Sequence, residues 1–195
     1  MSRSKRRGER RARFTLGRRT VVRLAVGFLA GLGFWLLFSA PYERGVAATA
    51  QALIRLFERP PVTTLSAPGG EIRVDRSDFP PASPRPGLPA ADLHFNFVLL
   101  AALFALDPRP LAPGRFGRFW LAAAGLFAIH VVALISQVES IYATRLGEWS
   151  AAHYGTLARN VWAAAFHFYA IAGRFAAPFA LWWGFRGEVP TPGED

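Results

Sequence analysis

Two long runs without a formally charged side chain constrain this fold more than any other feature. Residues 24–40 (LAVGFLAGLGFWLLFSA) and 119–138 (FWLAAAGLFAIHVVALISQV) contain no Asp, Glu, Lys or Arg. A helix that crosses the hydrocarbon layer of a bilayer needs about 20 mainly apolar residues, with about 17 as the usual lower limit. Both runs meet that limit, so each predicts a transmembrane helix. The first is expected to end at Pro41, because proline cannot continue the helical hydrogen-bond ladder.

Two further apolar segments extend this prediction. Residues 161–185 are long enough to span, although Arg174 lies near their middle and Pro178 follows one turn later. Residues 93–106 are shorter, a length more typical of a buried or re-entrant segment, but residues 89–92 bring the segment close to the minimum. We therefore expect an all-α polytopic membrane protein with four transmembrane helices.

The distribution of basic residues predicts the orientation. The chain carries a formal charge of +10, and ten of its 23 Lys and Arg lie in residues 1–23, opposed there by Glu9 alone. The loop 107–118 is also basic, whereas the connections 41–92 and 139–160 are balanced in charge. By the positive-inside rule, both termini, including the tail 186–195, are expected in the cytoplasm. A cleaved signal peptide is the alternative interpretation of the first run, but the later spans favour an uncleaved anchor.

The first outer connection has predicted structure of its own. An amphipathic helix is expected over residues 42–58, because apolar residues recur there every three or four positions. Residues 62–75 alternate around a Pro-Gly-Gly turn, which indicates a small β-hairpin, and the Pro-rich residues 79–89 lead into the second span. The second connection, 139–160, is expected at the membrane interface. The apolar stripe of the helix consists of Val46, Ala50, Leu53, Ile54 and Phe57.

Arg174 is the most informative single residue, because an arginine inside a bilayer usually faces a bundle interior, a cavity or a partner. Pro178 cannot donate to the carbonyl of Arg174, so a cation and a free carbonyl share one place. On a regular helix, Asn160 and His167 fall on the same face as Arg174, although apolar residues separate these polar members. This polar face predicts a contact with an acidic group of a partner, a lipid or a substrate. The alternative is an arginine that snorkels towards the headgroups.

His130 and His167 lie in neighbouring predicted spans and offer a second interpretation. Paired imidazoles can ligate a haem iron, so a cofactor or small-ligand subunit built around these two histidines and Arg174 is an alternative. Interhelical hydrogen bonding is the favoured use, and we expect no cofactor. An outer metal or acid/base site from Glu139, Glu148 and His153 is more remote, because their spacing matches no zinc signature.

The remaining features narrow the class of protein. The absence of cysteine excludes a disulfide framework, a thiolate metal site and a cysteine nucleophile. Gly27 and Gly31 form a GxxxG step that allows close helix packing. The basic arm is expected to meet anionic lipids rather than nucleic acid.

The combined layout resembles the small membrane proteins that accompany bacterial exosortases, in particular the exosortase H-associated family. The similarity includes the basic arm and anchor, EIRVDRSD in the outer hairpin, DLHFNFVLLAALFALDP before the Arg-flanked turn, and GLFAIHVVAL. Exosortases are membrane cysteine transpeptidases, and this chain has no cysteine, so it is not that enzyme. The resemblance implies a non-enzymatic accessory or scaffold of the bacterial inner membrane, with an exosortase as partner in sorting exported proteins.

Overall fold

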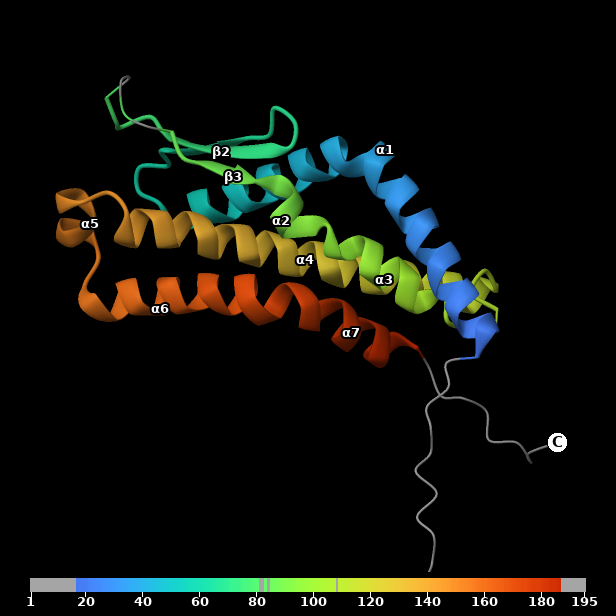
Figure 1. The fold of residues 1–195 in the computed structure, drawn as a ribbon. Coiled ribbons are helices and arrows are strands. Elements are labelled where there is room, and N and C mark those ends of the chain that lie inside the picture. Colours follow the sequence, from blue (N-terminus) through green and yellow to red (C-terminus); the bar gives the residue numbers. More distant parts are fainter. Residues whose placement is uncertain (1–16, 81–82, 84, 108, 187–195) are drawn as a thin grey trace, which may run out of the picture.

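The computed structural model describes residues 17–80, 83, 85–107 and 109–186. The basic arm before residue 17, the tail after residue 186 and part of the Pro-rich segment lie outside the described residues. The described chain is mostly helical, with one small sheet (Figure 1). Its elements are α1 (Arg18–Phe57), β1 (Thr63–Ser66), β2 (Glu71–Arg76), β3 (Gly87–Pro89), α2 (Ala90–His94), α3 (Asn96–Phe104), α4 (Pro113–Thr144), α5 (Glu148–His153), α6 (Thr156–Phe168), the π-helical turn η1 (Tyr169–Gly173) and α7 (Arg174–Phe185).

Helix α1 joins the first predicted span and the predicted amphipathic helix into one element of 40 residues. The expectation that the first span ends at Pro41 is therefore wrong, because Pro41 lies inside α1. Its ring is exposed, and a proline can remain in a long helix at the site of a bend. Figure 1 shows α1 changing direction between its blue first half and its cyan second half. The second half lies along the sheet and α4.

The predicted second span forms two short helices, α2 and α3, separated at Phe95. Helix α3 contacts α1 on one side and α7 on the other. Gly31 makes the first approach possible: a Cβ there would lie 2.8 Å from the Cβ of Ala101, and a Cβ on Gly27 would overlap Ala105. The GxxxG step therefore faces α3, where the two backbones come close.

Helix α4 runs the length of the molecule and contacts α1, α3, α6 and α7. Among the described residues, α1 and α4 are the two helices long and apolar enough to cross a membrane, judged by length and composition. The segment expected as the fourth span is interrupted by η1 between α6 and α7. The architecture is thus mainly helical, with two candidate spans and a small sheet.

The predicted hairpin is part of a three-stranded antiparallel sheet in the order β1-β2-β3. Leu65 of β1 pairs with Val74 of β2, and Ile72 of β2 pairs with Leu88 of β3. Gly69 and Gly70 form the turn with positive φ angles, a conformation that glycine adopts without steric cost. Strand β3 was not expected, because three residues are too few for an alternating pattern.

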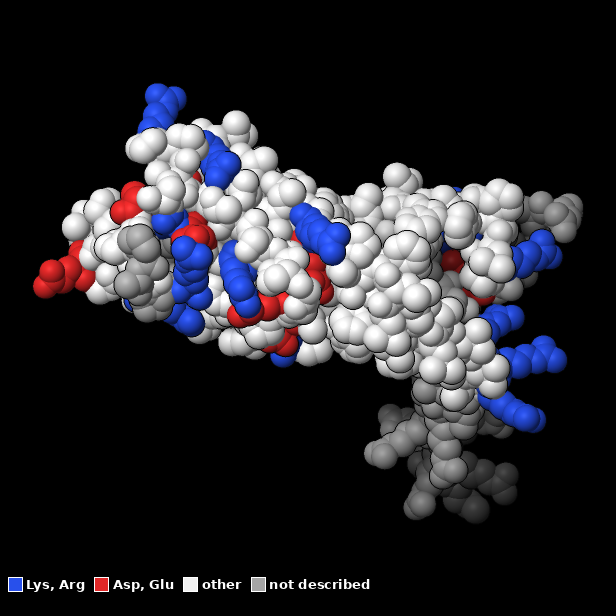
Figure 2. Space-filling model, turned by 90° about the horizontal axis from the view of Figure 1, so that it is seen from above, with Lys and Arg blue, Asp and Glu red and all other residues white. Residues whose placement is uncertain are grey.

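Large apolar side chains remain exposed on α1, on α4 and on the α6–α7 run, and large exposed apolar patches are rare in soluble proteins. Charged residues gather over the sheet and at the end where α1 begins, with an uncharged band between them (Figure 2). The exposed residues include Val26, Leu29, Leu36 and Leu37 of α1, Val132 of α4, and Leu157, Phe168, Ile171, Phe175 and Trp183 of the α6–α7 run.

Candidate functional site at a buried polar junction

Polar side chains from the helices meet in the interior, in what we call the polar junction. It is defined by Tyr42 and Glu43 of α1, His94 of α2, Asn96 of α3, His130 of α4 and the backbone carbonyl of Arg174 of α7. The hydrogen-bonded partners lie 34 to 88 residues apart in the chain. Burial of such groups costs free energy unless each finds a hydrogen-bond partner, so their pairing determines how the helices fit together.

Glu43 connects the helices to the sheet. Its side chain is 4 % exposed, and its two oxygens accept from the backbone N–H of Gly70, at 3.0 Å, and from Nε2 of His94, at 3.2 Å. The indole N–H of Trp35 lies 2.9 Å from Nδ1 of His94. An indole nitrogen only donates, so Nδ1 of His94 is the acceptor. Nε2 of His94 therefore carries the proton and donates a hydrogen bond to Glu43. One carboxylate thus holds both α2 and the β1–β2 turn.

His130 continues the junction across the bundle. It is fully buried, with Nδ1 2.7 Å from the hydroxyl of Tyr42 and Nε2 2.8 Å from Oδ1 of Asn96. The amide nitrogen of Asn96 donates to the carbonyl of Arg174 at 2.8 Å. A carbonyl only accepts, so the other end of the amide is an acceptor and His130 donates to it. The donors therefore run in one direction, from Tyr42 through His130 and Asn96 to Arg174.

The carbonyl at the end of this series is the one that Pro178 leaves without a helical donor. In a regular α-helix the N–H of residue 178 would donate to the carbonyl of residue 174, but proline has no N–H. Asn96 supplies the missing donor from another helix. The free carbonyl inferred from the sequence is thus occupied by a side chain from α3.

The residues of the predicted polar face of the fourth span do not share one environment in the structure. Asn160 and His167 are exposed, whereas Arg174 is half-buried and Pro178 is buried. The π-helical turn η1 lies between the two pairs. A π-turn has wider i→i+5 hydrogen bonding than an α-helix, so it rotates everything after it. Regular periodicity could not anticipate this change.

The histidine pair is also separated. Both ring nitrogens of His130 are engaged in hydrogen bonds, and His167 is an exposed residue whose ring lies against Phe166, 5.0 Å between centroids. Axial ligation of iron needs a free imidazole lone pair, so His130 would have to give up its contact with Tyr42. The described residues contain no cluster of three or more His, Asp or Glu placed to hold a metal ion. The geometry favours interhelical hydrogen bonding by His130.

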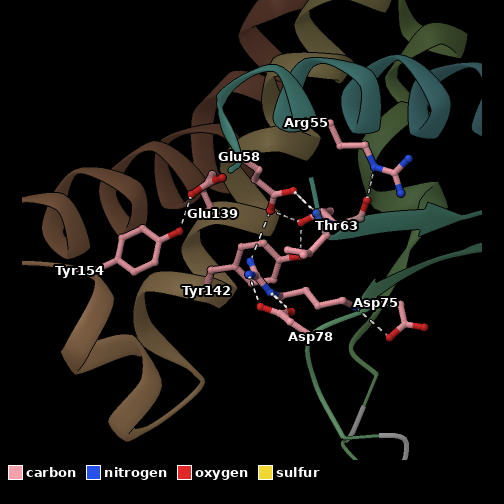
Figure 3. A network of polar contacts seen from close by, with 10 residues as sticks. Arg55, Glu58, Thr63, Asp75, Asp78, Glu139, Tyr142 and Tyr154 are labelled. Carbon is pink, nitrogen blue, oxygen red and sulfur yellow. Dashed lines mark hydrogen bonds and ion pairs between the residues drawn. The ribbon is translucent and has the colours of Figure 1, made fainter. Parts of the chain in front are cut away.

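A second polar cluster joins the sheet to α4 (Figure 3). Arg76 of β2 forms ion pairs with Glu58, at 3.3 Å, and with Asp78, at 2.9 Å. Its guanidinium lies 4.9 Å from the ring centroid of Tyr142 and 4.7 Å from that of Trp149. Figure 3 shows Glu58 beside Thr63 and Tyr142, with dashed lines joining their polar atoms. Arg76 is thus enclosed by acids and aromatic rings of this chain.

The edge of β1 is covered by the last turns of α1. Gln51 accepts from the N–H of Leu65 at 2.7 Å, and Arg55 donates to the carbonyl of Thr63 at 2.6 Å. Glu58 accepts from the N–H of Thr63 at 2.9 Å. An unpaired strand edge is a site for unwanted pairing, and here the helix side chains take up its polar groups.

Glu139, Glu148 and His153 are not brought together. Glu139 accepts from the hydroxyl of Tyr154 at 2.8 Å, whereas His153 stacks on Trp149, 4.2 Å between ring centroids. Burial and the Glu139 carboxylate raise the pKa of the Tyr154 phenol, which therefore stays protonated and keeps donating. These contacts connect the region of α5 to α4 and engage Glu139 and His153 separately.

Several members of the junction were missed from the sequence. Glu43 was not included in the predicted apolar stripe, but it lies three, seven and eleven residues before the buried Val46, Ala50 and Ile54. That spacing places it on the buried face, and the pattern could have revealed it. His94 and Asn96 lie near the start of the predicted second span. Their hydrogen-bond partners are distant in the chain, so no local pattern identified them.

Comparisons with protein-family models, with curated proteins and with solved structures found no match.

Proposed function

We propose that this chain is an integral membrane accessory protein that presents a rigid outer sheet to a membrane partner. The observation that carries this proposal is the uncharged band of exposed apolar side chains between two charged ends (Figure 2). Such a band is stable in hydrocarbon and unfavourable in water. An apolar protein surface of this kind favours a function carried out within the bilayer.

In this proposal the chain crosses the inner membrane four times, with both termini in the cytoplasm. The start of α1, the start of α4 and the end of α7 lie at one end of the molecule (Figure 1). That end carries basic residues on all three helices, as the positive-inside rule requires of a cytoplasmic face. They are Arg18, Arg19 and Arg23 on α1, Arg115 and Arg118 on α4, and Arg186 directly after α7.

A scaffold role follows from how the polar groups are used. The side chains of Glu43, His94, Asn96 and His130 bond to each other or to the backbone of other elements. Pairing of this kind fixes the position of the sheet relative to the bundle. The resemblance to exosortase-associated proteins supplies the class of partner, an exosortase-type sorting enzyme of the same membrane.

Membrane topology is tested with single cysteines, because the chain has none of its own. Ser77→Cys and Ala152→Cys change exposed outer residues, and Gly117→Cys changes an exposed residue near the start of α4. We expect a membrane-impermeant maleimide to label the first two in intact spheroplasts and the third only after lysis. Labelling of residue 117 from outside, or release of the protein by alkaline carbonate, would contradict the proposal.

The partner is tested by co-purification with a tagged exosortase from mild detergent. Arg73 and Arg85 are exposed on the sheet side and their side chains are more than half exposed. We expect Arg73→Glu and Arg85→Glu, each made singly, to lower exosortase recovery, whereas Arg145→Glu at the end of α4 is the charge-matched control. Equal recovery of the partner with all variants would exclude this face as the contact.

A further inference from the structure

A groove of about 430 Å³ lies beside α3, lined by residues of α1, α2, α3 and α7. Its polar lining comes from Asp92, Asn96 and Arg174, and its apolar lining includes Phe28, Leu99 and Phe175. Binding sites for small molecules have volumes of about 300–1,000 Å³. The groove is therefore large enough for a substantial part of an amphiphilic molecule.

The polar and apolar residues are separated along the groove. Asp92, Asn96 and Leu99 follow one another at helical spacing, with the two polar residues first and Leu99 one turn further along α3. Phe28 adjoins Gly27, which packs against the far end of α3 at Ala105. One end of the groove thus offers charge and hydrogen bonds, and the other offers hydrocarbon contact.

Arg174 has bonding capacity that the chain does not use. Its Nε is buried and has no hydrogen-bond acceptor among the described residues, and its guanidinium lies over the ring of Phe175, 4.8 Å from the centroid. Asp92 lines the same groove, yet the ion pairs found in the described part of the chain do not join these two residues. The groove thus has one basic and one acidic side chain in its lining, and neither takes part in the ion pairs found among the described residues.

We propose that this groove binds a membrane phospholipid with a phosphoethanolamine headgroup. The phosphate accepts from the guanidinium of Arg174, the ammonium donates to Asp92, and an acyl chain lies against Phe28, Leu99 and Phe175. A zwitterionic headgroup matches both charges, whereas an anionic lipid leaves Asp92 facing like charge and a choline headgroup offers no N–H donor. An arginine in hydrocarbon costs free energy unless its charge is paired. The phosphate of this lipid pairs with Arg174, so the side chain does not need to snorkel towards the headgroups.

The test rests on the membrane insertion proposed above and uses the full-length chain in mild detergent. The probes are dioleoyl phosphatidylethanolamine, phosphatidylglycerol and phosphatidylcholine, together with water-soluble glycerophosphoethanolamine. Retained lipid is counted by native mass spectrometry, and affinity is measured from the lipid dependence of thermal unfolding. We expect phosphatidylethanolamine to bind more tightly than the other two lipids, and the soluble headgroup to bind weakly because it lacks the acyl contacts.

Two variants assign the contacts. Arg174→Gln should weaken phosphatidylethanolamine binding about tenfold, the size expected for loss of one charge-assisted hydrogen bond. Its backbone carbonyl, which Asn96 holds, is unchanged. Asp92→Asn alters an exposed residue and should abolish the preference over phosphatidylglycerol while keeping phospholipid binding. Arg73→Gln, the same change of charge on the sheet, is the control and should bind as the wild type does.

Equal affinity for the three lipids, or an unchanged preference in Asp92→Asn, would overturn the assignment. Tight binding of glycerophosphoethanolamine would assign the site to a soluble phosphate compound instead. A protein that resists carbonate extraction yet shows no lipid preference refutes the groove and leaves the proposed membrane function intact. Release by carbonate refutes the membrane function itself.

Discussion

The amide nitrogen of Asn96 lies 2.8 Å from the carbonyl oxygen of Arg174, across 78 residues of chain. This bond replaces the one that Pro178 cannot make, and the same Asn96 side chain accepts from His130. A proline in one helix is therefore compensated by an amide in another. The pairing gives the polar junction a direct test.

Asn96→Leu should destabilise the protein by about 1–3 kcal/mol for each buried group left without a partner, here the carbonyl of Arg174 and the N–H of His130. Pro178→Ala restores a helical donor to that carbonyl, so the double variant Asn96→Leu/Pro178→Ala should recover part of the loss. Thermal unfolding followed by the fluorescence of the six tryptophans measures the cycle. Strictly additive effects of the two changes would show that the residues do not share the carbonyl.

Glu43→Ala should loosen the connection between the sheet and the helices. It leaves the N–H groups of Gly70 and His94 without acceptors, at about 1–3 kcal/mol for the buried His94 and less for Gly70, which is exposed to water. Hydrogen exchange of a peptide containing Gly70 should become faster, and the unfolding temperature should fall. Arg44→Ala changes the exposed neighbour on the same turn of α1 and should leave exchange as in the wild type; faster exchange in both variants would argue against the specific bond.

Gly31→Ala should destabilise the contact between α1 and α3. The added Cβ would lie 2.8 Å from the Cβ of Ala101 and 3.3 Å from the backbone of Val98, and overpacking of this kind costs about 1–3 kcal/mol. Gly33→Ala is a matched control in the same helix, because nothing lies within 4 Å of its new Cβ. In detergent, only Gly31→Ala should lower the unfolding temperature. Equal unfolding temperatures of the two variants would show that the close approach of α1 and α3 does not require glycine at position 31.

The contact between Arg76 and Asp78 should give an acid-dependent stability. The hydrogen bond from Arg76 lowers the pKa of Asp78 below its ordinary value of 3.8. A lowered pKa in the folded state means that the stabilisation is present above pH 3.8 and is lost as the pH falls through the lower, folded-state value. The effect is small, because the Asp78 side chain is 41 % exposed and solvent screens it.

Unfolding temperatures of the wild type and Asp78→Asn should therefore differ slightly at pH 6 and converge in strong acid. Arg76→Gln provides the background in which the hydrogen bond is absent. In the Arg76→Gln background, Asp78→Asn should no longer change how the unfolding temperature depends on pH. A difference that persists unchanged to the lowest pH would assign the effect to something other than the ionisation of Asp78.

The sequence predicted the parts of the fold that depend on local pattern. The apolar runs correspond to helices, and the alternation around Gly69 and Gly70 corresponds to β1 and β2. The bounds at Pro41 were wrong because a helix can continue through a proline where it bends and its ring is exposed. Strand β3 was not predicted because its three residues are recognised as a strand only by their pairing with β2.

The site was less accessible to prediction, because its geometry depends on contacts between distant residues. The shared periodicity of Asn160, His167 and Arg174 assumed a regular helix, and η1 rotates the last away from the others. The sequence did show that Pro178 leaves the carbonyl of Arg174 without its helical donor. The partner of that carbonyl, Asn96, lies on α3, and no spacing within one helix could reveal it.

The polar junction also has a consequence for biosynthesis. Tyr42 and Glu43 are made early, but His94 follows 51 residues after Glu43 and His130 follows 88 residues after Tyr42. Arg174, which closes the series, is synthesised last. Each early polar group is therefore synthesised before its partner exists, and a chain that stops before α7 leaves Asn96 without its carbonyl. Only a completed chain can satisfy the junction, so the same bonds that hold the mature protein distinguish it from its own truncated forms.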